Sequence, residues 1–217
     1  MRGLIEKDLR LMFKRKQILL VIVFVEIMLG ISGSGNFAVV YFTLLGGIIA
    51  AGTLSYDEFD NGLEFLFTLP IDRKTYIRGK YVLCAAFCAA AWLISTILYF
   101  VTGMITGHSV DILGELPALF VILPSVTMVA TVILPLQLKY GTEKGRVVLF
   151  VICGCLAAAF VFIQNVLFST EDALAEFSAR LQGVSMGAAL LGIIAFSILI
   201  VFITYNFSVR IMQKKEL

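Results

Sequence analysis

Charged side chains are scarce in this chain of 217 residues. Asp, Glu, Lys and Arg make up 15% of the sequence and 60% of the residues are apolar, whereas ordinary soluble domains carry about 25% charged residues. A single soluble core of this size cannot bury so much apolar surface. The composition therefore excludes an ordinary soluble protein and predicts an integral membrane protein.

Residues suited to catalysis are also few. The chain has one histidine, His108, and no Gly-Lys-Ser or Gly-Lys-Thr run of the kind that holds a nucleotide phosphate. The sequence shows no metal-ligand cluster and no serine or cysteine nucleophile with a base at a recognisable spacing. We therefore expect no catalytic residue, metal or cofactor in this chain. The four cysteines lie in apolar runs, which favours packing over a disulfide framework.

Long apolar runs are what the sequence has in abundance. A helix needs about 20 residues to cross the bilayer core, and six runs reach or approach this length: residues 17–33, 37–55, 81–105, 116–136, 147–168 and 183–207. Residues 34–36 alone separate the first two, which predicts a tight helical hairpin. We predict a single all-α domain over residues 1–217 with six transmembrane helices.

Lysine and arginine lie almost entirely on one side of these spans. The N-terminal segment, the loops after the second and fourth spans and the C-terminal tail hold all of them except Arg180. Because such residues accumulate in cytoplasmic loops, both termini should be cytoplasmic. A cleavable signal peptide is an alternative reading of the first run, but the long charged leader and Glu26 within the run disfavour it.

Two further segments have amphipathic patterns. In residues 1–16, apolar residues recur at helical spacing opposite a basic face, which predicts an N-terminal helix in the membrane interface. In residues 169–182, acids follow a serine and a threonine, which predicts a short external helix between spans five and six. The alternatives are a basic flank that only fixes topology and an ordinary loop.

The cytoplasmic segment 56–80, between spans two and three, concentrates charge. It carries five acids and four bases: Asp57, Glu58, Asp60, Glu64, Asp72, Arg73, Lys74, Arg78 and Lys80. A helix here would place Phe59, Leu63, Leu66 and Phe67 on one side and would end at Pro70. Such a segment can dock a soluble partner and transmit its movement to two spans. The alternative is a static loop that only sets topology.

In this segment the chain resembles the permease subunits of type-2 ABC exporters. The matching pattern is an acid, a glycine, leucines, a Leu-Pro turn followed by basic residues, and Gly-Lys at the head of the next span: Glu58, Gly62, Leu63, Leu66, Leu69, Pro70, Asp72, Arg73, Gly79 and Lys80. Asp72 stands where the family often has serine or threonine. The overall topology is also similar, and the small size resembles bacterial exporters of amphipathic peptides, such as those of phenol-soluble modulins and bacteriocin-immunity systems.

The resemblance implies a transmembrane subunit in the bacterial plasma membrane that is not itself an enzyme. It implies a second permease copy, identical or not, and a separate ATP-binding cassette subunit that hydrolyses ATP with Mg²⁺. That subunit would contact the coupling residues Glu58, Gly62, Leu63, Leu66, Leu69, Pro70, Asp72, Arg73 and Lys74. The cargo would be hydrophobic or amphipathic. Membrane lipid is the other expected partner, and nucleic acid is not expected.

Two residues within the spans are candidates for the substrate pathway. Glu26 lies about 15 Å beyond Lys16 along a helix, near the middle of the bilayer, where an ionisable group usually faces the protein interior. Trp92 lies well within span three. For Glu26, a functional role and a packing role remain equally open.

Two other classes of membrane protein compete with an exporter. A lipid-modifying enzyme would need clustered acids, for which Asp57, Glu58, Asp60 and Glu64 are the candidates. A secondary transporter would favour several ionisable groups within the spans or an internal repeat, and Glu26 alone fits that pattern.

Overall fold

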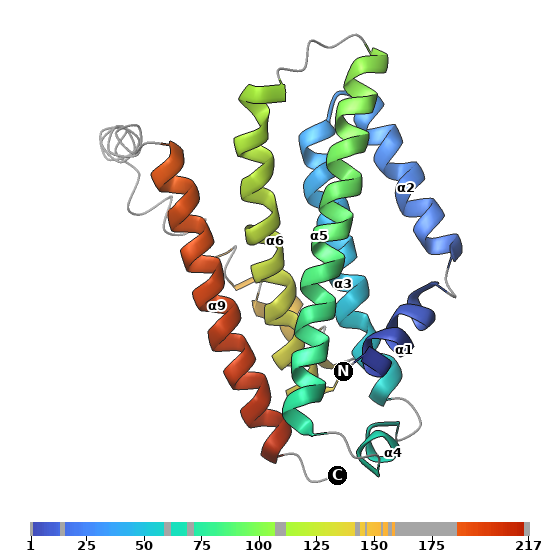
Figure 1. Ribbon diagram of the computed structural model, residues 1–217, viewed down its shortest axis with the longest axis vertical. Coiled ribbons are helices and arrows are strands. Elements are labelled where there is room, and N and C mark those ends of the chain that lie inside the picture. Colours follow the sequence, from blue (N-terminus) through green and yellow to red (C-terminus); the bar gives the residue numbers. More distant parts are fainter. Residues whose placement is uncertain are drawn as a thin grey trace.

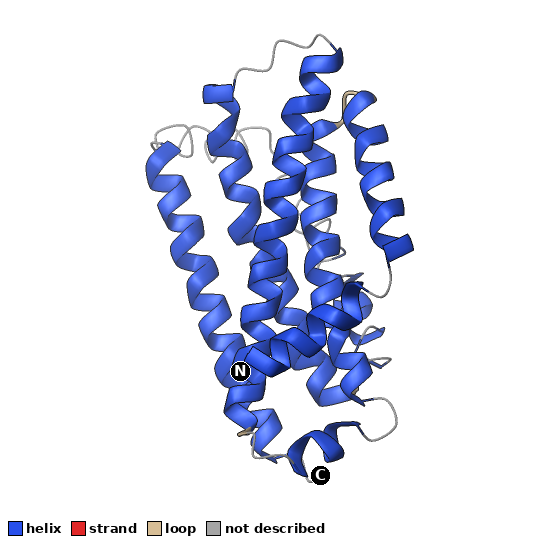
Figure 2. Ribbon diagram, turned by 45° about the vertical axis from the view of Figure 1, so that its right-hand side comes forward, coloured by secondary structure: helices blue, strands red, loops and turns tan. Residues whose placement is uncertain are grey.

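The computed structural model describes residues 2–13, 16–58, 62–68, 72–106, 112–141, 144–145, 147–152, 154–155, 158 and 186–214. These residues form helices and short connections, with no strand among them (Figure 2). The larger helices are α1 (Arg2–Phe13), α2 (Lys16–Ile31), α3 (Gly35–Glu58), α4 (Gly62–Thr68), α5 (Arg73–Thr106), α6 (Ile112–Tyr140) and α9 (Met186–Lys214). Most of the predicted fifth span, the predicted external helix 169–182, His108, Leu69 and Pro70 lie outside the described residues.

Four of the described helices are long and apolar enough to cross a membrane. They cover Gly35–Glu58, Arg73–Thr106, Gly114–Tyr140 and Gly187–Lys214. They correspond to predicted spans two, three, four and six. The first predicted span forms the shorter apolar helix Leu19–Ile31 within α2. The prediction of an all-α, multi-pass membrane protein agrees with this architecture, and the total of six spans stays a prediction.

The long helices run roughly along one direction and α1 crosses one end of them (Figures 1 and 2). α3 packs against both α5 and α6, α9 packs mainly against α6, and α2 packs against α3 and α5. α1, α4 and the last turns of α9 lie at the same end of the bundle (Figure 1), which we call the charged end. This common placement fits the predicted location of both termini on one side of the membrane.

The turn between α2 and α3 occupies residues 32–34, two residues earlier than predicted. Gly33 has a φ of 84°, a left-handed conformation that glycine adopts without steric cost. Its N–H donates to the carbonyl of Gly30, and the Ser34 N–H donates to that of Leu29. These bonds satisfy carbonyls at the end of α2, as in the common glycine-terminated helix end. The hairpin was therefore predicted, but its turn was misplaced.

Two glycines on α3 allow neighbouring helices to approach closely. A Cβ at Gly46 would lie 2.7 Å from the Cβ of Ala91 on α5. A Cβ at Gly47 would lie 2.7 Å from the Cβ of Ala130 on α6 and 2.9 Å from Cys88 Sγ. Small residues let transmembrane helix backbones come together in this way. The Gly46–Gly47 pair thus fixes α3 between α5 and α6.

The largest buried cluster lies toward the charged end and joins six helices. It includes Met12 of α1, Leu54 of α3, Leu63 and Leu66 of α4, residues of α5 and α6, and Met212 of α9. The short helix α4 is therefore held by the same core that packs the ends of the long helices.

Candidate functional site: a buried charge cluster and a short helix at the charged end

Four charged side chains meet at the charged end, in what we call the charge cluster: Lys7, Asp8, Asp57 and Lys80. Lys80 Nζ lies 2.7 Å from Asp8 Oδ2 and 2.7 Å from Asp57 Oδ2. Lys7 pairs with Asp57 and lies 3.6 Å from Asp8 Oδ1. Asp8, Asp57 and Lys80 are each at most 5% exposed. The two acids and two bases balance in charge, which is how proteins tolerate ionised groups away from water.

Neutral side chains complete the charge cluster. The Tyr76 hydroxyl donates to Asp57 Oδ2 at 2.8 Å, and Lys80 donates to Thr53 Oγ1 at 3.0 Å. Burial raises the pKa of the Asp8 carboxyl above its ordinary value of 3.8, and the adjacent Lys80 ammonium opposes this rise. The hydrogen bonds made by Tyr76 and Thr53 offset part of the cost of burying these charges.

The charge cluster joins three helices that are distant in sequence. Lys7 and Asp8 belong to α1, Asp57 to the end of α3, and Lys80 to the second turn of α5. α3 and α5 are the helices that precede and follow α4. The cluster therefore sets the position of α1 relative to both helices that carry α4.

α4 presents two different faces. Leu63 and Leu66 are buried in the core, and Phe67 is half-buried with its ring 5.8 Å from that of Tyr76. On the other side, Glu64 is exposed and Phe65 is 72% exposed. The predicted apolar side of this segment is thus confirmed for Leu63, Leu66 and Phe67, while Phe59 lies outside the described residues.

Arg73 begins α5 and contacts the end of α9. Its guanidinium donates to the carbonyls of Met212 at 2.9 Å and Gln213 at 3.2 Å, and it lies over the Phe67 ring at 5.7 Å. A cation is favourable at the C-terminal end of a helix, where carbonyls lack helical partners. The neighbouring Asp72 and Lys74 are exposed.

These contacts bury part of segment 56–80, which the sequence predicts as a charged docking segment between two spans. α3 extends to Glu58 and α5 begins at Arg73, so both ends of the segment belong to long helices. Asp57 and Lys80 are buried against each other and against α1. The exposed side chains that remain on α4 and at the start of α5 include Glu64, Phe65, Asp72 and Lys74.

The two candidates for the substrate pathway are both buried. Glu26 is 3% exposed and accepts a hydrogen bond from Ser95 Oγ of α5, in agreement with its predicted interior placement. Trp92 donates from Nε1 to the carbonyl of Leu119 at 2.9 Å, and its ring lies 5.2 Å from that of Phe120. Glu26 thus connects α2 to α5, and Trp92 connects α5 to α6. A role in transport stays a prediction for each.

Two of the acids proposed for a lipid-modifying enzyme, Asp57 and Glu64, lie in different surroundings. Asp57 is buried in the charge cluster, whereas Glu64 lies on the exposed side of α4, and Asp60 lies outside the described residues. Among the described residues, no group of three His, Cys, Asp or Glu side chains is placed to hold a metal ion.

Sequence reasoning missed Asp8 and Phe65. Asp8 interrupts the basic face of the N-terminal helix between Lys7 and Arg10. An acid at that position is the sequence signal that could have identified Asp8 as the partner of a buried base. The sequence does not single out Phe65, because it is one of several aromatic residues in an apolar stretch. Its importance depends on which face of α4 is buried, which the three-dimensional packing decides.

Comparison with known proteins adds the family. The chain matches the model of the ABC-2 family transporter proteins over residues 3–213. No curated protein and no solved structure matches the chain. The matched region includes every helix that forms the charge cluster and α4. The chain is a multi-pass membrane protein and belongs to the ABC-2 family of transporter proteins.

Proposed function

We propose that this chain is the transmembrane subunit of an ATP-driven exporter in a bacterial plasma membrane, and that a separate ATP-binding cassette subunit hydrolyses the ATP. ABC-2 permeases normally work with such a subunit. Two permease copies would form the pathway. The cargo would be a hydrophobic or amphipathic molecule, with amphipathic peptides as the preferred class from the resemblance described above.

One observation carries the proposal of where the ATPase docks: α4 exposes Phe65 and Glu64 while its opposite face is anchored in the core. Aromatic side chains, phenylalanine among them, are enriched in the buried core of protein–protein interfaces. Because α3 and α5 flank α4 in the chain, a partner that displaced α4 would move the ends of two spans. Because Leu63 and Leu66 pack in the core, a displacement of α4 would also be transmitted through their contacts with the long helices.

The proposal is tested by co-expression with a candidate ATP-binding cassette subunit encoded beside this chain. Phe65→Ala should abolish co-purification and the stimulation of ATP hydrolysis by the permease. Phe37→Ala is the matched control, because Phe37 is also exposed but lies in the first turn of α3, far along that helix from Glu58. Undiminished complex formation by the Phe65 variant would exclude α4 as the docking element.

A further inference from the structure

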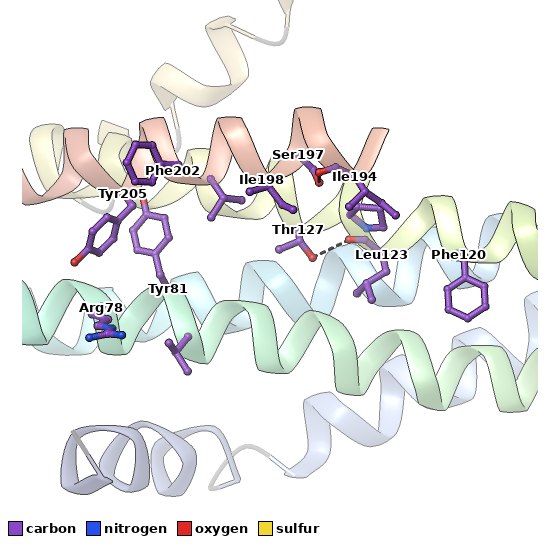
Figure 3. A pocket seen from close by; sticks show the side chains of 13 residues that line it. Arg78, Tyr81, Phe120, Leu123, Thr127, Ile194, Ser197, Ile198, Phe202 and Tyr205 are labelled. Atoms are coloured by element: carbon purple, nitrogen blue, oxygen red, sulfur yellow. Dashed lines mark hydrogen bonds between the residues drawn. The ribbon is translucent and has the colours of Figure 1, made fainter. Parts of the chain in front are cut away.

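A groove lies between α5, α6 and α9, and neither α4 nor Glu26 contributes to its lining. It encloses a volume of about 760 Å³. Figure 3 shows Arg78 toward the end where Tyr81 and Tyr205 lie, with Phe120 toward the opposite end. Arg78 is the one charged residue in the lining that the structure describes. The groove therefore combines an apolar interior with a cation at one end.

Three of the hydroxyl groups in the lining are paired within the protein. Thr127 donates to the carbonyl of Leu123 at 2.7 Å, and Ser197 donates to that of Ile194 at 2.8 Å. The Tyr81 hydroxyl pairs with Ser208 Oγ at 2.8 Å. The interior thus offers an occupant mainly apolar contact. Arg78 is exposed, and its guanidinium can pair with an anion.

The dimensions of the groove suit one membrane leaflet. Along α9 it extends from Ile194 to Tyr205, about 17 Å at the helical rise of 1.5 Å per residue. Half of the hydrocarbon core of a bilayer is about 15 Å thick. Ile198 and Phe202 are lining residues with exposed side chains, so the groove is accessible from the side of the bundle.

We propose that this groove binds an acyl chain of an anionic phospholipid from the cytoplasmic leaflet, with the lipid phosphate beside Arg78. The chain would lie along α9, and the guanidinium would pair with the phosphate, a geometry for which arginine is well suited. The choice of leaflet rests on the proposed function, in which α4 at the charged end contacts an ATPase on the cytoplasmic side. The lipid site itself requires neither the ATPase nor a cargo.

The test uses a tryptophan reporter in the groove. Trp92 is the single tryptophan of the chain, so Phe202→Trp in a Trp92→Phe background reports on the groove alone. The purified chain is placed in vesicles that contain brominated phosphatidylglycerol or brominated phosphatidylcholine, and quenching is measured. The anionic lipid should quench with about a fivefold preference, the factor expected for one basic residue near an anionic headgroup.

Matched variants separate the groove from the general lipid surface. Arg78→Gln should remove the preference, whereas Arg210→Gln should keep it, because exposed Arg210 is not a lining residue. A reporter at Phe196, exposed on the same helix but outside the lining, should show equal quenching by both lipids. Native mass spectrometry of the chain with Trp92 intact, with and without Arg78→Gln, repeats the comparison independently of the reporter.

Three results would overturn the proposal. Equal quenching by both lipids at position 202 would show that the headgroup is not selected. Absence of quenching by either lipid would show that protein fills the groove, either a second copy or another segment of this chain. The same preference at positions 196 and 202 would show a general attraction to the surface. None of these results depends on whether the chain works with an ATPase.

Discussion

Lys80 of α5 and Asp8 of α1 form a buried ion pair with an Nζ to Oδ2 distance of 2.7 Å. The two residues are 72 positions apart in the sequence. The pair ties the N-terminal helix to the helix that follows α4, and the shared contact of Lys80 with Asp57 extends the connection to α3. The charged end is therefore a single packed unit.

Removal of the ammonium from the charge cluster should destabilise the protein. In Lys80→Met, Asp8 and Asp57 stay buried with Lys7 as the remaining cation, and breaking a buried pair in this way typically costs about 3–5 kcal/mol. We expect a large decrease in the thermal unfolding midpoint of the detergent-solubilised protein. Lys74→Met, at an exposed position on the same helix, should have little effect. Equal midpoints for the two variants would contradict the assigned role of Lys80.

The pH dependence of stability should change in Asp8→Asn. Because burial raises the pKa of Asp8 in the folded protein, the folded state holds this proton more tightly than the unfolded chain. The stabilising contribution is complete below pH 3.8 and disappears as the pH rises through the raised value. Asparagine cannot titrate, so acidification from pH 7.5 to 4 should lower the unfolding midpoint more in the variant than in the unmodified chain. An equal decrease of the unfolding midpoint in both proteins on acidification would contradict the raised pKa of Asp8.

Arg73→Ala should loosen the end of α9. The substitution removes two hydrogen bonds to the carbonyls of Met212 and Gln213, and a side-chain hydrogen bond to a charged group contributes about 1.5–3 kcal/mol. Amide hydrogen exchange in the last two turns of α9 should increase, with little change at the middle of α6. Lys74→Ala serves as the control. Unchanged protection of α9 would show that Arg73 does not hold this helix end.

Gly47→Ala should disturb the contact between α3 and its neighbours. The added Cβ would lie within 3 Å of Ala130 Cβ and Cys88 Sγ, and forcing an extra methyl group into a packed interior costs about 1–3 kcal/mol. Gly52→Ala is an internal control on the same helix, because no heavy atom lies within 4 Å of a Cβ there. The yield of monodisperse protein and its unfolding midpoint should decrease for Gly47→Ala alone.

Glu26 should tolerate an amide but not an apolar side chain. Glu26→Gln keeps the acceptor for Ser95 Oγ and should leave the unfolding midpoint nearly unchanged. Glu26→Leu leaves the buried Ser95 hydroxyl to find another acceptor, which should cost about 1–3 kcal/mol. If Glu26 also contacts cargo, Glu26→Gln should reduce cargo-stimulated ATP hydrolysis while basal hydrolysis persists. A more stable Glu26→Leu variant with normal transport would contradict the interior role.

The sequence predicted the helical membrane architecture because long apolar runs are unambiguous signals. It also predicted that Leu63 and Leu66 lie on one side of a helix in this segment, since they follow helical spacing, but not that this side packs inward. It did not predict the charge cluster, because Lys7, Asp8, Asp57 and Lys80 meet only after three helices pack together. For the same reason, charges assigned to a docking surface proved to be buried. Local patterns define the elements, whereas the pairing of their charges depends on tertiary contacts.

A photo-crosslinking amino acid at position 65 tests whether α4 contacts an ATP-binding cassette subunit. In cells that express the complete transporter, illumination should attach this position to the ATP-binding cassette subunit. The same amino acid at position 37, exposed at the other end of α3, should not attach to it. Crosslinking from position 65 to lipid or unrelated protein alone, with the subunit present and the complex intact, would contradict the claim.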